Sequence, residues 1–128
     1  MFRLPLKTVL VADAAVCALF FIAGAFATGA IATLTGLPEE IVRIAGLICL
    51  PVAAALAFLV SQAVPNRALL GFIAIGNLGW VAASLAVAAT FAAMLTPLGW
   101  AVVIGQAAAV LVVALIEANG ARAALVNA

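Results

Sequence analysis

The sequence predicts an all-α fold, a transmembrane four-helix antiparallel bundle that forms a single domain over residues 1–128. Three observations predict it. The chain is 70% hydrophobic and carries only five basic and four acidic side chains, too few to cover a soluble domain of this size. Four apolar stretches reach the length of about 20 residues that a spanning helix needs. Proline and glycine stand in the short breaks between these stretches.

The four apolar stretches account for nearly the whole chain, so no second domain is expected. Pro and Gly mark the breaks at Gly36 to Pro38, at Pro65 and at Pro97, where one helix ends and the next begins. Because the links are short, each helix is expected to run antiparallel to its predecessor. The expected spans cover residues 8–34, 41–64, 68–95 and 98–119.

Small residues recur in all four spans and are expected at the helix contacts. Lipid provides no hydrophobic drive for helices to associate, so close backbone approach at small residues is the usual contact. The expected contact residues are Gly24, Thr28, Gly29, Gly46, Gly71, Gly76, Gly79 and Gly105.

Asp13 in the first span and Glu117 in the fourth are the acidic residues within the expected spans. The residues around Asp13 repeat at three-to-four spacing, which predicts that its face points into the bundle. The two carboxylates either bind a cation or relay a proton, or they are interfacial and pair with Lys7, Arg67 or Arg122. The interfacial interpretation is favoured, because side chains near a helix end can extend to the membrane surface.

Arg43 enters the second span one turn after Glu39 and Glu40. This spacing favours a structural salt bridge on the helix surface. The alternative is a contact with an anion or a lipid phosphate at the outer membrane surface. Pro51 lies inside the same span and is expected to kink it.

Asn77 and Trp80 share one face of the third span, and Gln106 lies at a comparable depth in the fourth. A hydrogen bond between Asn77 and Gln106 would fix the register of the two helices, and this structural role is favoured. The alternative is a small-ligand pocket formed by these three residues with the rings of Phe20 and Phe21.

The basic residues predict the orientation in the membrane. Four crossings place Arg3, Lys7, Arg67 and Arg122 on one side and Arg43 on the other. By the positive-inside rule both termini are expected to face the cytoplasm.

Several classes of activity are not expected. The chain has no histidine and a net charge of +1, which disfavours haem and zinc sites and nucleic-acid binding. No nucleophile lies beside a plausible base and no phosphate-binding loop is present. We therefore expect no enzyme, no cofactor and no metal.

The ordered set of these features resembles a group of uncharacterised bacterial four-span integral membrane proteins. The resemblance covers nearly the whole chain and implies a protein of the bacterial inner membrane, without implying any activity. The residues that carry it are Asp13, Gly36-Leu37-Pro38, Arg43-Ile44-Ala45-Gly46-Leu47, Leu50-Pro51, Arg67, Asn77, Trp80, Gln106, Glu117, Gly120 and Arg122. Leu78-Gly79, between Asn77 and Trp80, departs from the pattern by placing a glycine where a larger side chain is expected.

Three functions remain open. The favoured one is a self-associating bundle, a homo-oligomer or an accessory subunit of a larger membrane complex, because faces of small residues are typical of packing. The second is a protein that binds a lipid or another apolar small molecule between its helices. The third is a transporter or channel for a small solute or a proton, based on the polar residues inside the spans.

Overall fold

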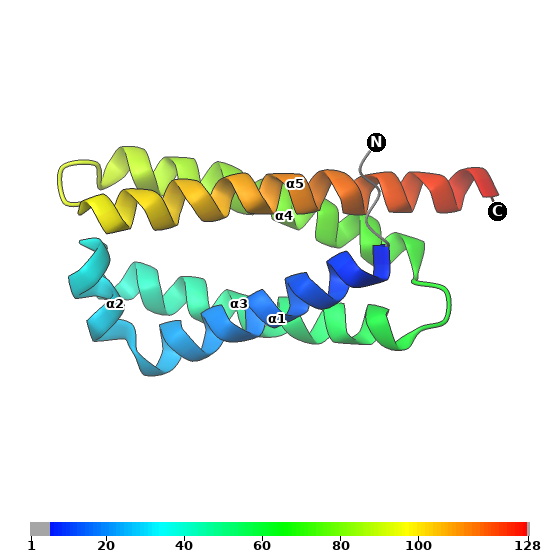
Figure 1. Ribbon diagram of the computed structural model, residues 1–128, viewed down its shortest axis with the longest axis horizontal. Helices are drawn as coiled ribbons and strands as arrows, with labels where there is room; N and C mark the ends of the chain where they lie inside the picture. Colours follow the sequence, from blue (N-terminus) through cyan, green and yellow to red (C-terminus); the bar gives the residue numbers. More distant parts are fainter. Residues whose placement is uncertain (1–5, 128) are drawn as a thin grey trace.

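A computed structural model describes residues 6–127, with side chains described for residues 6–122. The described part is all helical, as the sequence predicts (Figure 1). Four of its helices are long and apolar enough to cross a membrane, with α5 counted over Pro97–Arg122. The chain is therefore a multi-pass membrane protein. The helices are α1 (Leu6–Phe26), α2 (Thr28–Thr35), α3 (Glu39–Ser61), α4 (Arg67–Thr90) and α5 (Pro97–Asn127).

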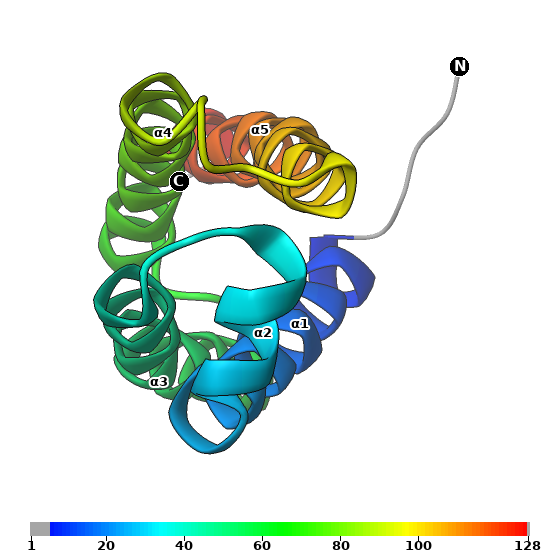
Figure 2. The same cartoon turned by 90° about the vertical axis from the view of Figure 1, so that its left-hand side faces the viewer.

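The expected first span at 8–34 is not one helix, because the chain breaks at Ala27 between α1 and α2. Ala27 has φ −126° and ψ 31°, outside the helical range. The Thr28 hydroxyl donates to the Gly24 carbonyl one turn earlier, a contact that bends helices. As a result α2 turns away from the axis of α1 and contacts α3 and α5 at one end of the bundle (Figure 2).

The other spans lie close to their expected positions but end differently. α3 and α4 end at residues 61 and 90, before the expected 64 and 95, and α5 continues past 119 to residue 127. Polar side chains replace the helical hydrogen bonds in the link after α3. The Gln62 side chain accepts from the Asn66 amide (2.9 Å), and the Asn66 side chain accepts from the Leu69 amide at the start of α4 (3.0 Å). Pro51 lies inside α3, which continues beyond it.

The spanning helices form two tightly packed antiparallel pairs, α1 with α3 and α4 with α5 (Figure 1). Contacts between the two pairs are much sparser. The 62–66 link lies at the same end of the bundle as the start of α1 and the end of α5, and α2 and the 91–96 link lie at the opposite end. The interior between the pairs is therefore the place where a cavity can form.

Gly24 and Gly46 form the closest contact between α1 and α3. A Cβ atom added to Gly24 would lie 2.8 Å from Cα of Gly46 and 2.9 Å from the Val42 carbonyl oxygen. Both glycines are therefore contact residues, as expected. Four other expected contact glycines are not, because a Cβ added to any of them would meet no atom of the described chain within 4 Å. These are Gly71, Gly76, Gly79 and Gly105.

The end of α2 is tied to the link before α5. The Thr96 amide donates to the Thr35 carbonyl (3.0 Å), and the Thr96 hydroxyl donates to the Leu34 carbonyl (2.6 Å). Gly36 ends α2 with φ +80°, which a residue with a side chain rarely adopts, and its missing Cβ makes room for the Met94 carbonyl. This junction connects the two helix pairs at the α2 end.

A group of apolar side chains closes the opposite end of the interior. It comes from α1, α3 and α4, and all of its members are buried. The group consists of Leu10, Leu56, Leu59, Leu70 and Ile73. We call it the leucine cluster. The middle of the bundle lies between this cluster and α2. Within the described interior, buried polar side chains from different spanning helices meet only there.

Candidate functional site

The first polar group in the interior joins three helices. Asn77 of α4 donates through Nδ2 to Oε1 of Glu117 on α5 (2.6 Å) and lies 3.4 Å from Oδ2 of Asp13 on α1. The Cys17 thiol lies 3.7 Å from Oδ1 of Asp13, one turn further along α1. We call Asp13, Asn77 and Glu117 the carboxyl cluster. A single amide thus bridges two carboxyl groups that belong to different helix pairs.

Glu117 is fully buried, and its second oxygen, Oε2, has no hydrogen-bond partner among the described residues. Lys7, Arg67 and Arg122 are all exposed, and none of them forms an ion pair with a carboxyl of the cluster within residues 6–122. The favoured expectation, that these carboxylates are interfacial and pair with those cations, is therefore wrong. Glu117 lies inward because its helix packs against α4 at this depth, where Asn77 offers a donor.

The second polar group lies one turn further from the termini. Trp80 Nε1 donates to Oε1 of Gln106 (2.7 Å), and Gln106 Nε2 donates to the Ser84 hydroxyl (2.9 Å) and to the Val103 carbonyl (2.7 Å). The Ser84 hydroxyl in turn donates to the Trp80 carbonyl (2.8 Å). We call Trp80, Ser84 and Gln106 the indole network.

The expected hydrogen bond between Asn77 and Gln106 is not formed, because each amide has other partners. α4 and α5 are antiparallel, so a residue later in α4 lies beside a residue earlier in α5. Gln106 consequently lies beside Trp80 and Ser84, whereas Asn77 lies at the depth of Glu117. The position of a residue within its predicted span does not define its depth in the bundle to within one helical turn.

A cavity of about 480 Å³ lies between the two helix pairs, next to the indole network. Its walls come from all five helices and are almost entirely apolar. Phe20, Trp80, Ser84 and Gln106 line it, and Gly24 and Gly46 form part of its wall where α1 crosses α3. This volume is within the range of about 300–1,000 Å³ typical of small-molecule sites.

Three of the five residues expected at the pocket line the cavity, namely Phe20, Trp80 and Gln106. Asn77 belongs to the carboxyl cluster instead. The Phe21 ring packs edge-on against Phe26, with ring centroids 6.3 Å apart, and does not line the cavity. The expectation missed Ser84, whose position one turn after Trp80 was the available signal.

Arg43 is exposed on α3, and within the described residues no ion pair joins it to Glu39 or Glu40. The expected salt bridge is therefore not formed. All three side chains are exposed near the start of α3 and do not line the cavity.

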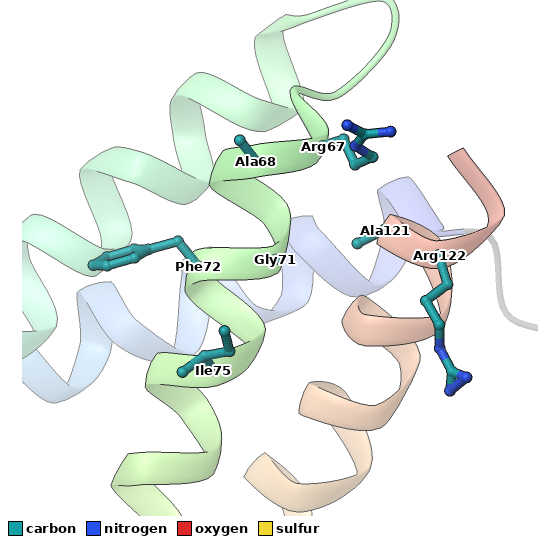
Figure 3. Close-up of a pocket in the computed structure, with 7 residues that line it drawn as sticks. All are labelled: Arg67, Ala68, Gly71, Phe72, Ile75, Ala121 and Arg122. Atoms are coloured by element: carbon teal, nitrogen blue, oxygen red, sulfur yellow. The ribbon is translucent and has the colours of Figure 1, made fainter. Parts of the chain in front are cut away.

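A second, shallower hollow of about 420 Å³ lies between the start of α4 and the end of α5 (Figure 3). Phe72 and Ile75 line it and are 72% and 71% exposed, so they face the surroundings of the bundle. The side chains of Arg67 and Arg122 extend from its rim in different directions (Figure 3). This hollow has no buried polar side chain, so the cavity beside the indole network is the better candidate site.

No protein-family model, no curated protein and no solved structure matches this chain.

Proposed function

We propose that this protein binds an apolar small molecule or lipid that carries a hydrogen-bond donor, inside the membrane and between its two helix pairs. The observation that supports this proposal is the cavity of about 480 Å³ with the indole network in its wall. An apolar cavity with a few convergent polar groups is the usual form of a small-molecule site. The binding function, rather than self-association, is therefore our first proposal.

The hydrogen bonds of the indole network define the chemistry of the ligand. An indole N–H can only donate, so the oxygen of the Gln106 amide must face Trp80. Both N–H groups of the Gln106 amide are then used, by Ser84 and by Val103. The Ser84 hydroxyl donates its only hydrogen to the Trp80 carbonyl. The remaining capacity of the network is lone pairs, which accept, so a ligand with a hydroxyl or N–H group fits best.

The cavity is accessible from the lipid side. Ile44 and Ile48 of α3 line it and are 53% and 46% exposed. Leu98 and Val102 of α5 also line it and are 50% and 41% exposed. The described side chains enclose the cavity only in part, so it has an opening on the surface of the bundle. A hydrophobic ligand can therefore enter from the bilayer without crossing water.

Fluorescence of Trp80 tests the proposal directly. The chain has two tryptophans, so Trp100→Phe leaves Trp80 as the only one, in the cavity wall. We expect a long-chain alcohol to change its emission saturably and to bind about fivefold more tightly than the methyl ether of the same chain, since one hydrogen bond is worth about 1 kcal/mol. Gln106→Leu should weaken this preference, because it removes the amide oxygen and leaves Ser84 as the remaining side-chain acceptor. Equal binding of alcohol and ether to the parent protein would contradict the assignment of the acceptor groups.

A matched pair of substitutions on α4 tests the position of the site. Both alanines are exposed, but Ala83 lines the cavity and Ala86 does not. Ala83→Phe is expected to fill the cavity and to weaken binding of the alcohol at least tenfold, and Ala86→Phe is expected to leave it unchanged. Titration of Trp80 fluorescence in the Trp100→Phe background measures both. If the two variants bind alike, the ligand does not occupy this cavity.

Self-association, as a homo-oligomer or within a larger complex, is the second candidate. It is supported by Gly71, Gly76, Gly79 and Gly105, which have open space beside them in the single chain and would let another helix approach closely. The mass of the protein in mild detergent tests this candidate. A strictly monomeric particle that carries no other protein would count against it.

We also propose that the chain belongs to the bacterial inner membrane, with both termini in the cytoplasm. Lys7, Arg67 and Arg122 support the orientation, because they share the end of the bundle opposite Arg43. Labelling of single cysteines placed in the 62–66 and 91–96 links tests it. The 62–66 link is expected to be accessible only from the cytoplasm, and the reverse pattern would contradict the proposal.

A further inference from the structure

The carboxyl cluster contains more negative groups than the described structure neutralises. Asn77 provides one amide N–H₂ group, which serves both Asp13 and Glu117. Glu117 is fully buried and its Oε2 has no partner among the described residues. A buried ionised carboxylate is very costly unless it is paired or fully hydrogen-bonded. Asp13 is half-buried and shares the same donor, so two ionised carboxylates here would repel each other as well.

No cationic side chain of the described chain faces this cluster. On α1 the neighbouring ionisable groups are Cys17 and the exposed Lys7. On α3 they are the buried Cys49 and the exposed Arg43. On α4 and α5, Arg67 and Arg122 are exposed near the helix ends. The described side chains therefore leave the positive charge that the pair requires to a bound species.

We propose that Asp13, Asn77 and Glu117 form a proton-binding site in which the two carboxyl groups hold one proton between them. The unpartnered Oε2 of Glu117 is the position where the proton can bind without breaking a hydrogen bond that the structure shows. A single proton leaves one negative charge, and the Asn77 amide is already placed to stabilise it. The site is independent of the ligand proposed for the cavity, because none of its three residues lines the cavity.

The donor set favours a proton over a metal ion. A proton needs one oxygen, whereas Ca²⁺ and Mg²⁺ take about six oxygen ligands. The cluster offers two carboxyl groups and one amide, and a thiol that already faces Asp13. The described residues contain no group of three or more acidic, cysteine or histidine side chains arranged to hold a metal ion.

Infrared spectroscopy of the full-length protein in lipid vesicles tests the site. The chain has only four acidic side chains, and the two outside the cluster, Glu39 and Glu40, are exposed. We expect the carbonyl band of one protonated carboxyl group per chain at neutral pH, with and without Na⁺ and Ca²⁺. The band should persist in Glu40→Gln and disappear in Asp13→Asn/Glu117→Gln.

Three results would overturn the proposal. The first is a wild-type protein without the band at neutral pH. The second is a band that appears only after Na⁺ and Ca²⁺ are removed, which would indicate a metal ion in place of the proton. The third is a band that the double substitution leaves unchanged. The first two results are measured on the unmodified protein, so they test the proposal even if the double variant fails to fold.

Discussion

Replacement of Gly24 by leucine is expected to separate α1 from α3 and to unfold the protein at a lower denaturant concentration than any exposed substitution. A Cβ at this position would lie 2.8 Å from the backbone of Gly46, and backbone atoms cannot rotate away as a side chain can. Overpacking of a tight contact costs about 1–3 kcal/mol and occasionally more. Because the contact involves two backbones, we expect about 3 kcal/mol. Helix content measured by circular dichroism during unfolding in a denaturing detergent gives the change in stability.

Gly76→Leu is the matched control for this experiment. Gly76 also lies in a spanning helix, but a Cβ there would meet no described atom within 4 Å. We expect Gly76→Leu to leave stability unchanged or to raise it slightly, since glycine inside a helix costs about 1 kcal/mol relative to alanine. Equal losses in the two variants would show that the Gly24 contact is not the closest approach of the helices. The same control reports on self-association, because loss of an oligomer in Gly76→Leu would place the α4 glycines at its interface.

Asn77→Leu is expected to have the second large effect. The substitution removes the only side-chain donor that the structure gives to the Glu117 carboxyl and leaves that group in an apolar interior. Removal of one partner from a buried polar group costs about 1–3 kcal/mol, and more when the remaining group is charged. We expect a loss of about 3 kcal/mol, measured by the same unfolding experiment.

A second substitution separates this cause from a simple packing defect. In Asn77→Leu/Glu117→Leu both partners of the 2.6 Å hydrogen bond are apolar, so the fully buried carboxyl is removed together with its donor and only the half-buried Asp13 loses its longer contact of 3.4 Å. The double variant is expected to be more stable than Asn77→Leu alone, because the interaction between the two residues is then removed as a unit. If the losses of stability in Asn77→Leu and in Glu117→Leu, each measured alone, add up to the loss in the double variant, the Asn77 amide does not stabilise Glu117.

The polar residues of the interior are arranged in order along the bundle axis. The cavity lies on the α2 side, the indole network forms part of its wall, and the carboxyl cluster lies one turn closer to the start of α4. The leucine cluster then closes the interior toward the termini. The carboxyl cluster joins α1 to α4 and α5, and thus connects the two helix pairs whose direct contacts are sparse. The proposed proton site therefore lies where it can hold the two halves of the ligand-binding interior together.

The positions of Asp13 and Glu117 depend on contacts that only the folded chain contains. Asp13 and Glu117 lie 104 positions apart in the sequence, and nothing in either local pattern indicates that both face Asn77. The choice between pairing with surface arginines and lying in the interior depends on the rotation of α1 and α5 about their axes. The cavity likewise depends on how far the two helix pairs separate, which no single span specifies.

The sequence was enough to predict that lipid surrounds the helices, how many helices span the membrane, where they approximately begin and end, and that they run antiparallel. These properties follow from apolar length and from proline and glycine breaks, which act locally. Only the folded chain shows that α1 ends at Phe26, that Gly24 contacts Gly46 while Gly76 has open space beside it, and that Gln106 pairs with Trp80 rather than Asn77. The physical reason is that nearly every side chain in these spans is apolar, so the pattern carries little information about which face of each helix turns inward.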